Sequence, residues 1–134
     1  MKQKNGMLKL KDLADISVCP WSPRMRSDSG RFPYIGIKGE TGFCDTANFE
    51  ADSIVMTRFG SGGGRVFYFS EPGFASGCFI LKGKTVSDTR ALYRYLKERR
   101  CPRSTVSPGH SIPQISLKAA EEFEIEIPPV DSET

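Results

Sequence analysis

The residue types that most often carry out chemistry are sparse in this chain of 134 residues. It contains four cysteines and a single histidine, His110. No two cysteines stand at the C-x-x-C spacing of common zinc sites, and no nucleophile motif accompanies the histidine. A Ser/His or Cys/His catalytic site needs a base beside its nucleophile, so the pattern argues against catalysis. We predict no catalytic residues, no cofactor and no metal.

A glycine-rich stretch, Gly60–Gly64, is the one segment that could hold a phosphate with its backbone amides. A Walker-type loop requires Lys followed by Ser or Thr, whereas Arg65 and Val66 follow here. A dinucleotide-binding loop should open a helix, but the residues after Gly64 are typical of a strand. Two interpretations stay open: a flexible hairpin tip, or a tip that approaches a ligand closely between Arg58 and Arg65. A small nucleotide-binding enzyme is the least favoured hypothesis.

Cationic residues are unevenly placed along the chain. The net charge is only +3, but Lys and Arg outnumber Asp and Glu by eight to four in residues 1–40 and by seven to two in residues 84–103. Residues 104–134 are acidic, with one basic residue against six acidic ones. This distribution fits a protein that presents one positive face to a polyanion, and it fits an ordinary domain equally well.

One proline-interrupted loop combines an aromatic residue with two arginines. Residues 19–30 contain two prolines, which break regular structure, and carry Trp21, Arg24 and Arg26. In one interpretation the tryptophan packs over the edge of the core and the arginines are solvated. In the other, the loop brings its arginines to phosphates or base edges. The sequence leaves both open.

The elements that must position these loops form a small sheet around the glycine tip. β-Branched and aromatic residues predict strands over Ser53–Phe59 and Arg65–Ser70. Both runs carry apolar residues at odd and at even positions, which point to opposite faces of a sheet. We therefore expect both faces of each strand to be covered by other parts of the chain. A turn at residues 71–73 precedes a third strand, Phe74–Leu81. The other strands expected are Phe32–Ile37, Phe123–Ile127 and a short one at Leu8 and Leu10.

Helical patterns are fewer. Residues 85–100 combine an apolar stripe with a basic one, capped by Ser87 or Asp88, and the basic stripe is either a solvated face or a binding face. Shorter helices are expected over Lys11–Ile16 and over Leu117–Glu122, the second capped by Ser116. Residues 38–42 should form a turn and residues 43–51 an irregular segment. No run is long and apolar enough for a membrane helix, and no signal peptide is seen.

We therefore predict an α+β fold: a mixed, largely antiparallel twisted sheet with a few short helices. It should be a single domain of residues 1–134, with loose tails at residues 1–6 and 130–134.

The order of these segments resembles the target-recognition domain of type I restriction–modification specificity subunits. The segments that carry the resemblance are Leu10–Ile16, Pro33–Ile37, Arg58–Val66, Phe74–Gly77, Phe79–Leu81, Leu92–Leu96, Gln114–Leu117 and Ile125–Pro129. The resemblance implies a non-catalytic DNA-binding domain that reads one half of a split site. It also implies that methyltransferase and nuclease activities reside in separate subunits.

The resemblance supplies no fixed list of base-reading residues, because the loops vary with the target. Position and side-chain chemistry select six candidates for DNA binding: Arg24, Arg26, Lys38, Arg58, Arg65 and Gln114. Arginine can bind guanine edges bidentately and glutamine can bind adenine in the same way, while the other candidates would contact phosphates. The expected partner is double-stranded DNA, with methyltransferase subunits or another assembly protein as further partners. The expected location is the cytoplasm, and no membrane is involved.

A full specificity subunit carries two recognition domains separated by long helices, whereas this chain shows one domain and no heptad helix. This departure keeps an alternative open. The chain would then be a structural or protein-interaction module, such as a virion component or a relict carried by a virus or phage, that retains the fold without DNA recognition.

Overall fold

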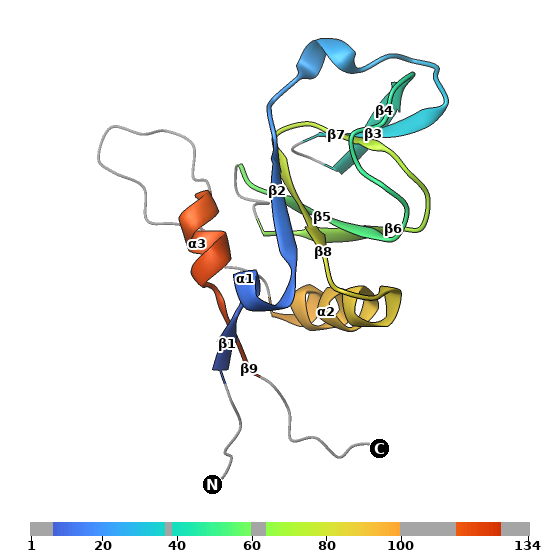
Figure 1. Ribbon diagram of the computed structural model, residues 1–134. Coiled ribbons are helices and arrows are strands. Elements are labelled where there is room, and N and C mark those ends of the chain that lie inside the picture. The colour runs from blue at the N-terminus through green and yellow to red at the C-terminus, as the bar shows by residue number, and fades with distance from the viewer. Residues whose placement is uncertain (1–6, 37–38, 60–63, 100–114, 127–134) are drawn as a thin grey trace, which may run out of the picture.

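The computed structural model of the protein describes residues 7–36, 39–59, 64–99 and 115–126. These residues form nine strands in three sheets, three α-helices and one short 3-10 helix, which confirms the predicted α+β class (Figure 1). The elements are β1 (Met7–Lys9), α1 (Leu10–Leu13), β2 (Asp15–Cys19), η1 (Pro23–Met25), β3 (Phe32–Gly36), β4 (Gly39–Cys44), β5 (Ser53–Thr57), β6 (Val66–Phe69), β7 (Phe74–Ala75), β8 (Cys78–Lys82), α2 (Val86–Glu98), α3 (Leu117–Glu122) and β9 (Glu124–Glu126).

The central sheet has four antiparallel strands in the order β2-β8-β5-β6. Every residue of β5 is buried, and successive side chains point to opposite faces. Ile54 and Met56 pack with α2, whereas Val55 packs with Ile35 of the neighbouring sheet. The expectation that the first run is covered on both faces is therefore confirmed. Both faces of β6 are packed as well, Val66 and Tyr68 against the cluster that includes α2 and Phe69 against the cluster on the other face, but its four residues are only half-buried because the strand lies at the edge of the sheet.

A three-stranded sheet, β4-β3-β7, covers the face of the central sheet opposite to α2. The expected single strand over Phe74–Leu81 is divided here: β7 pairs in parallel with β3, and β8 belongs to the central sheet. The chain changes sheets at Ser76 and Gly77, where Gly77 has φ +66°, a backbone conformation that suits glycine. The expected strand over Phe32–Ile37 is present as β3, and Ile37 lies outside the described residues.

Two boundaries predicted from local patterns are wrong. The helix expected over Lys11–Ile16 ends at Leu13, because Ala14 is extended and the next five residues pair with β8. The turn expected at residues 38–42 is replaced by β4, which begins at Gly39 and pairs with β3 as far as Cys44. In both cases pairing with a distant strand overrides the local preference.

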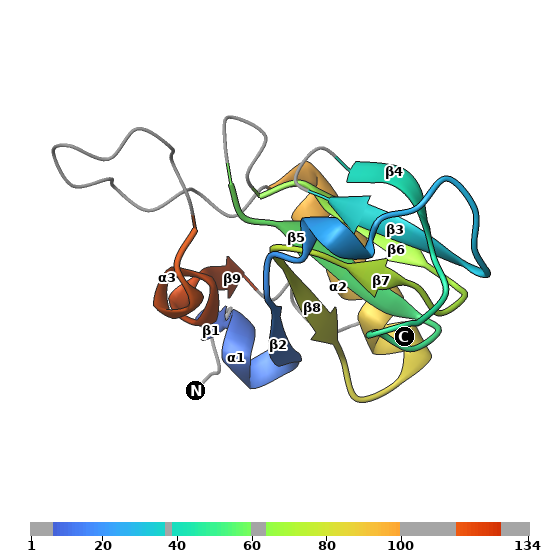
Figure 2. The ribbon, with the colours of Figure 1, turned by 90° about the horizontal axis from the view of Figure 1, so that it is seen from above.

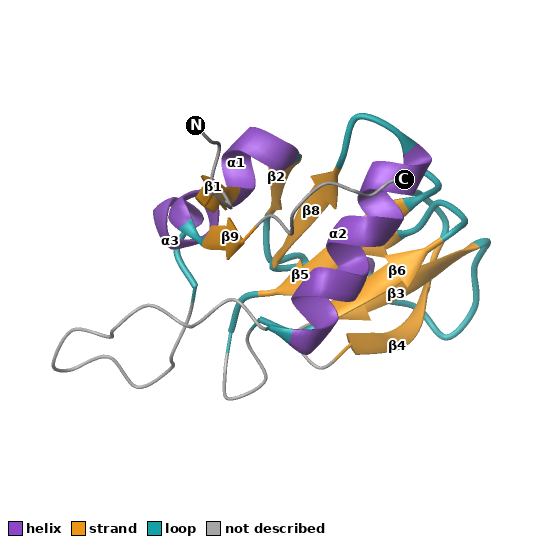
Figure 3. Cartoon of the chain, turned by 90° about the horizontal axis from the view of Figure 1, so that it is seen from below, coloured by secondary structure: helices purple, strands orange, loops and turns teal. Residues whose placement is uncertain are grey.

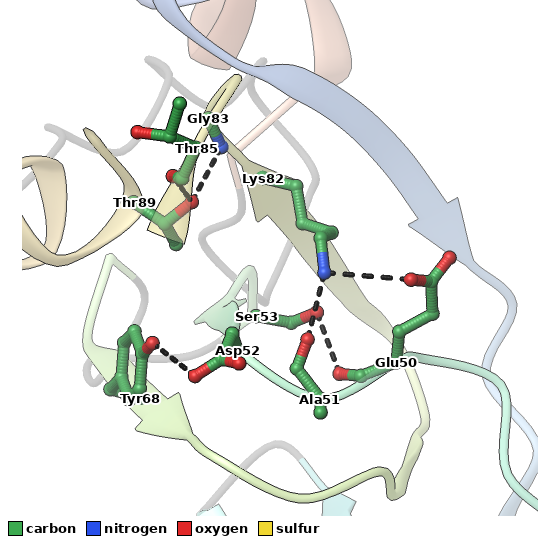
Figure 4. Close-up of polar contacts among 9 residues, drawn as sticks. All are labelled: Glu50, Ala51, Asp52, Ser53, Tyr68, Lys82, Gly83, Thr85 and Thr89. Atoms are coloured by element: carbon green, nitrogen blue, oxygen red, sulfur yellow. Dashed lines mark hydrogen bonds and ion pairs between the residues drawn. The ribbon is translucent and has the colours of Figure 1, made fainter. Parts of the chain in front are cut away.

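Helix α2 lies across the central sheet and covers one of its faces (Figure 3). Thr85 caps it, because the Thr85 side chain accepts a hydrogen bond from the backbone N–H of Asp88 at 3.0 Å. The expectation that Ser87 or Asp88 is the cap is therefore wrong by two or three residues. Thr89 joins the helix to β8, since its hydroxyl accepts a hydrogen bond from the Gly83 N–H at 2.9 Å (Figure 4).

A tight turn leads into β5 and is held by side chains from β6 and β8 (Figure 4). Asp52 has φ +59°, and its carboxylate accepts a hydrogen bond from the Tyr68 hydroxyl at 2.6 Å. The ammonium of Lys82 donates to the carbonyl of Ala51 at 2.7 Å and lies 3.6 Å from a carboxylate oxygen of Glu50. These contacts fix the start of the most buried strand.

The first and last described elements lie side by side (Figure 1). Strands β1 and β9 pair antiparallel, with Leu8 opposite Ile125. Helix α3 is present at its expected position and is capped by Ser116 as predicted. Glu122 at its end accepts hydrogen bonds from Lys9 at 2.6 Å and from Lys11 at 3.3 Å. These bonds lower the pKa of the Glu122 carboxyl below its usual value.

Candidate nucleic-acid interface

Strand register brings the predicted loops to one end of the central sheet. Cys78 lies opposite Cys19, the last residue of β2, and opposite Thr57, the last residue of β5. Val66, the first residue of β6, lies opposite Met56. The chain segments that follow β2 and β5, and those that precede β6 and β8, therefore all meet at this end. Helix η1 follows β2 on the side of the central sheet away from α2 (Figure 1), while the last turn of α2 lies beside the base of the glycine hairpin.

The backbone around Trp21 is fixed on both sides. The carbonyl of Pro20 accepts a hydrogen bond from the Gly77 N–H at 3.1 Å, and the Ser22 N–H donates to the Ser76 hydroxyl at 2.6 Å. The hydroxyl of Tyr34 donates to the Ser22 carbonyl at 3.0 Å. Ser76 and Tyr34 are both buried, so the loop is attached to the core through groups that solvent cannot displace easily.

Trp21 itself points outward. It is 69% exposed, the largest value among the large hydrophobic residues of the described chain. The interpretation in which this tryptophan packs over the edge of the core is therefore not supported. We call Trp21, Arg24, Met25 and Arg26 the η1 face, and Figure 2 shows η1 lying over the strands when the molecule is viewed from this side.

The two arginines of the η1 face differ in how far they are engaged. Arg24 is exposed and makes no hydrogen bond or ion pair with any residue that the structure describes. The Nε of Arg26 donates to the carbonyl of Thr41 on β4 at 2.7 Å, and its guanidinium lies 3.7 Å from Asp28. A guanidinium has five N–H donors, so Arg26 keeps donors for a ligand while one edge is fixed.

Arg58 is held within the protein. Its guanidinium carbon lies 4.7 Å from the centre of the Phe79 ring and 5.0 Å from that of Phe59, and its Nε donates to the carbonyl of Ile115 at 3.1 Å. Burial lowers the pKa of this guanidinium, and the nearby Cys78 thiol opposes that shift. The geometry makes Arg58 a support for the base of the glycine hairpin rather than a projecting group.

Arg65 lies at the other side of the same hairpin and is exposed. Its backbone is tied to Thr57, because the Thr57 N–H donates to the Arg65 carbonyl at 2.9 Å. Its side chain lines a small surface cleft of about 120 Å³ together with Lys97 from the last turn of α2. Sequence reasoning missed this pairing, since no local pattern connects the end of α2 with the base of the hairpin.

Two other arginines of α2 and its end, Arg90 and Arg99, are engaged within the protein. The Nε of Arg90 donates to the Tyr68 hydroxyl at 3.3 Å on the edge strand. Arg99 lies over the Tyr95 ring and 3.6 Å from Glu126. For these two cations the solvated-face interpretation fits better than the binding-face one.

Two of the six candidates, Lys38 and Gln114, lie outside the described residues. The residues next to them are placed. Gly39 pairs with Gly36 in the β3–β4 hairpin, and the Ile115 N–H donates to the carbonyl of Arg58 at 2.9 Å.

Burial makes two of the thiols poor nucleophiles. Cys19 and Cys78 face each other across β2 and β8, and burial raises the pKa of Cys19 to about 11 and that of Cys78 to about 12. Both thiols stay protonated at neutral pH, and a protonated thiol reacts poorly. In the described part of the chain, no three His, Cys, Asp or Glu side chains are grouped so that they could hold a metal ion. Nor does that part include a helix long and apolar enough to span a membrane.

Comparison with known proteins places this geometry in context. The fold is similar to the crystal structure of a Type-I restriction-modification system S subunit from M. genitalium, with a TM-score of 0.64 and 24% sequence identity. The similarity covers 90% of this chain and 33% of the M. genitalium chain, so this chain spans about a third of that subunit's length. No curated protein sequence matches the chain. Residues 2–133 match the family described as "Type I restriction modification DNA specificity domain". Because the match covers nearly the whole sequence, the chain belongs to the type I restriction modification DNA specificity domain family.

Proposed function

We propose that this domain recognises double-stranded DNA through the loops at the η1 end of the central sheet and has no catalytic activity of its own. The observation that carries the proposal is the placement of Arg24 and Arg65. Both are exposed, and both stand on segments whose backbones are tied to the sheet. Cations on fixed segments can contact an anionic duplex without a large cost in ordering loops.

The environments of these cations suggest different roles. Arg24 stands on a short helix and its guanidinium has no partner among the described residues, so it is our first candidate for a base edge in a groove, where arginine binds guanine bidentately. Arg65 and Lys97 flank one cleft and are candidates for phosphate contacts that set the register of the duplex. Arg26, fixed to β4 by one edge, is suited to a phosphate as well. Methylation and cleavage would belong to partner subunits.

The first test is binding to a pool of random-sequence duplexes, followed by selection of the best-bound sequence and measurement by fluorescence anisotropy. We expect affinity to fall steeply from about 50 to about 200 mM salt, since each phosphate contact contributes about 0.9 to the salt slope. Arg65→Ala should weaken all duplexes similarly and reduce that slope by about one. Arg24→Ala should cost about 1–3 kcal/mol for the selected duplex and relax its specificity.

Lys84→Ala is the matched control. Lys84 is exposed and follows β8 at the end opposite Cys78, so its removal changes the net charge equally without touching the η1 end. A salt-independent titration, or no selected duplex, would contradict the proposal and favour the alternative of a protein-interaction module. An effect of Lys84→Ala as large as that of Arg65→Ala would also count against it.

A further inference from the structure

Trp21 stands out among the described residues because it is large, apolar and exposed, yet not loosely held. It is the only tryptophan in the chain. Its neighbours Pro20 and Ser22 are hydrogen-bonded to Gly77 and Ser76, so the indole is exposed although the backbone of its loop is attached to the sheet. A soluble surface rarely displays a tryptophan in this way without a partner for it.

The immediate surroundings of the indole leave it free to meet a ligand. One edge rests near Gly77, since a Cβ built on that glycine would lie 3.5 Å from Cδ1 of Trp21 and 3.3 Å from the Phe59 ring. Met25, 42% exposed, extends the apolar surface on the same loop. The backbone is therefore close to one edge of the ring, and 69% of the surface of Trp21 stays exposed.

The charges beside the indole point to a nucleic acid as its partner. Arg24, three residues further on, carries a cation without an ion pair in the described residues, and Arg26 follows two residues later. A flat aromatic ring next to guanidinium groups suits a base step of a duplex, because a ring inserted there stacks on a base that it partly unstacks from its neighbour, while the cations neutralise the backbone. An apolar protein surface would leave the unpaired Arg24 charge poorly solvated.

We propose that Trp21 contacts a DNA base with the face of its indole ring, as an apolar base-contact residue beside Arg24. The inference rests on the proposed function and adds to it a side chain that reads the duplex without hydrogen bonds to base edges. Because Trp21 is held by backbone bonds on both sides, the ring is positioned before DNA arrives.

The single tryptophan makes the contact directly measurable. Intrinsic fluorescence of the whole chain is recorded while the selected duplex is added. A ring that stacks on a base should lose a large part of its emission in step with the binding curve from anisotropy. Trp21→Ala should weaken binding by about 5- to 150-fold, the range expected for one stacked base. It should leave the salt slope unchanged, since no cation is removed.

Two further variants separate the explanations. Trp21→Phe keeps an aromatic face but loses the indole N–H, so it should retain most of the affinity if the contact is with a base. Val86→Ala truncates another exposed apolar residue, 45% exposed, at the start of α2, and should bind as the parent does. Loss of affinity in Trp21→Phe equal to that in Trp21→Ala would indicate a hydrogen bond to phosphate and overturn the proposal.

The failure of this inference is distinguishable from failure of the proposed function. If the selected duplex binds with a steep salt dependence while the emission of Trp21 stays constant and Trp21→Ala binds normally, the indole does not contact DNA. In that case only this inference is wrong. If no duplex binds at all, the proposed function itself is wrong.

Discussion

Two arginines flank the glycine tip seven residues apart, and the protein uses them differently. Arg58 lies between the rings of Phe59 and Phe79 and bonds to the carbonyl of Ile115, whereas the side chain of Arg65 extends from the surface. In sequence both are arginines at strand ends. Burial and ring contacts, which depend on the packing of β8 and of the segment before α3, make the difference.

We expect Arg58→Ala to lower the free energy of unfolding by about 1–3 kcal/mol, because it removes a hydrogen bond and two ring contacts of a half-buried cation. Arg65→Ala is the control and should change that free energy by less than about 0.5 kcal/mol, since its side chain is exposed. Urea unfolding followed by circular dichroism measures both. Equal stability of the two variants would show that the contacts of Arg58 contribute nothing to the fold.

At the scale of elements, the entry into α2 joins the central sheet to its covering helix. The Thr85 side chain accepts a hydrogen bond from the backbone N–H of Asp88. The backbone carbonyl of Thr85 accepts a hydrogen bond from the Thr89 hydroxyl, and that hydroxyl accepts one from the N–H of Gly83 (Figure 4). The cap therefore satisfies helix-end donors and also fixes how the helix leaves β8.

We expect Thr85→Ala to cost about 0.5–2 kcal/mol of stability, the usual loss for removal of a capping side chain. Ser87→Ala should stay within about 0.5 kcal/mol, because Ser87 is exposed within the helix and alanine has the higher helix propensity. Thermal unfolding of the two variants in parallel provides the comparison. A larger loss of stability in Ser87→Ala than in Thr85→Ala would indicate that Ser87 is the cap, as the sequence pattern predicted.

The elements that could be predicted are those with strong local patterns. β5 and β3 are runs of apolar and β-branched residues, α2 has an apolar stripe, and α3 follows a serine that caps it. Strands β2 and β4 were missed because their extended conformation comes from pairing with β8 and β3. The division of Phe74–Leu81 into β7 and β8 was missed because a continuous apolar run does not reveal that its two halves join different sheets.

The candidate site was predictable to the level of loops. Sequence alone identified the loops that carry Arg24, Arg26, Arg58 and Arg65, because arginines between strands are visible in a sequence, and the register brings these segments to one end of the sheet. It could not show that Trp21 points outward, that Arg58 lies against two aromatic rings, or that Lys97 and Arg65 line one cleft. Each of these facts depends on contacts between segments far apart in the chain.

At the scale of the whole molecule, the described chain begins and ends in one two-stranded sheet. Ile125 of β9 is 3% exposed and belongs to the core cluster that contains Leu10, Leu92 and Leu96. The last strand thus completes the same core that the first helix and α2 cover. Figure 1 places this core at the end of the molecule opposite η1.

We expect Ile125→Ala to destabilise the protein by about 2–5 kcal/mol through loss of buried volume. If the chain is a single cooperative domain, hydrogen exchange in peptides from β3 and β5 should accelerate together, although β3 is remote from Ile125. Leu117→Ala, at a 37% exposed position on α3, should leave both peptides unchanged. Acceleration confined to β1, α3 and β9 would show that these elements unfold as a separate unit.

The bonds around Trp21 are made by main-chain atoms of Pro20 and Ser22 and by the buried groups of Ser76 and Tyr34. None of them uses the side chain of residue 21 or of residue 24. The hydrogen bonds that hold this loop therefore do not depend on which side chains stand at positions 21 and 24. Substitutions at these two positions can change what this surface presents, and under the proposed function the preferred DNA sequence, while the scaffold underneath keeps its stability.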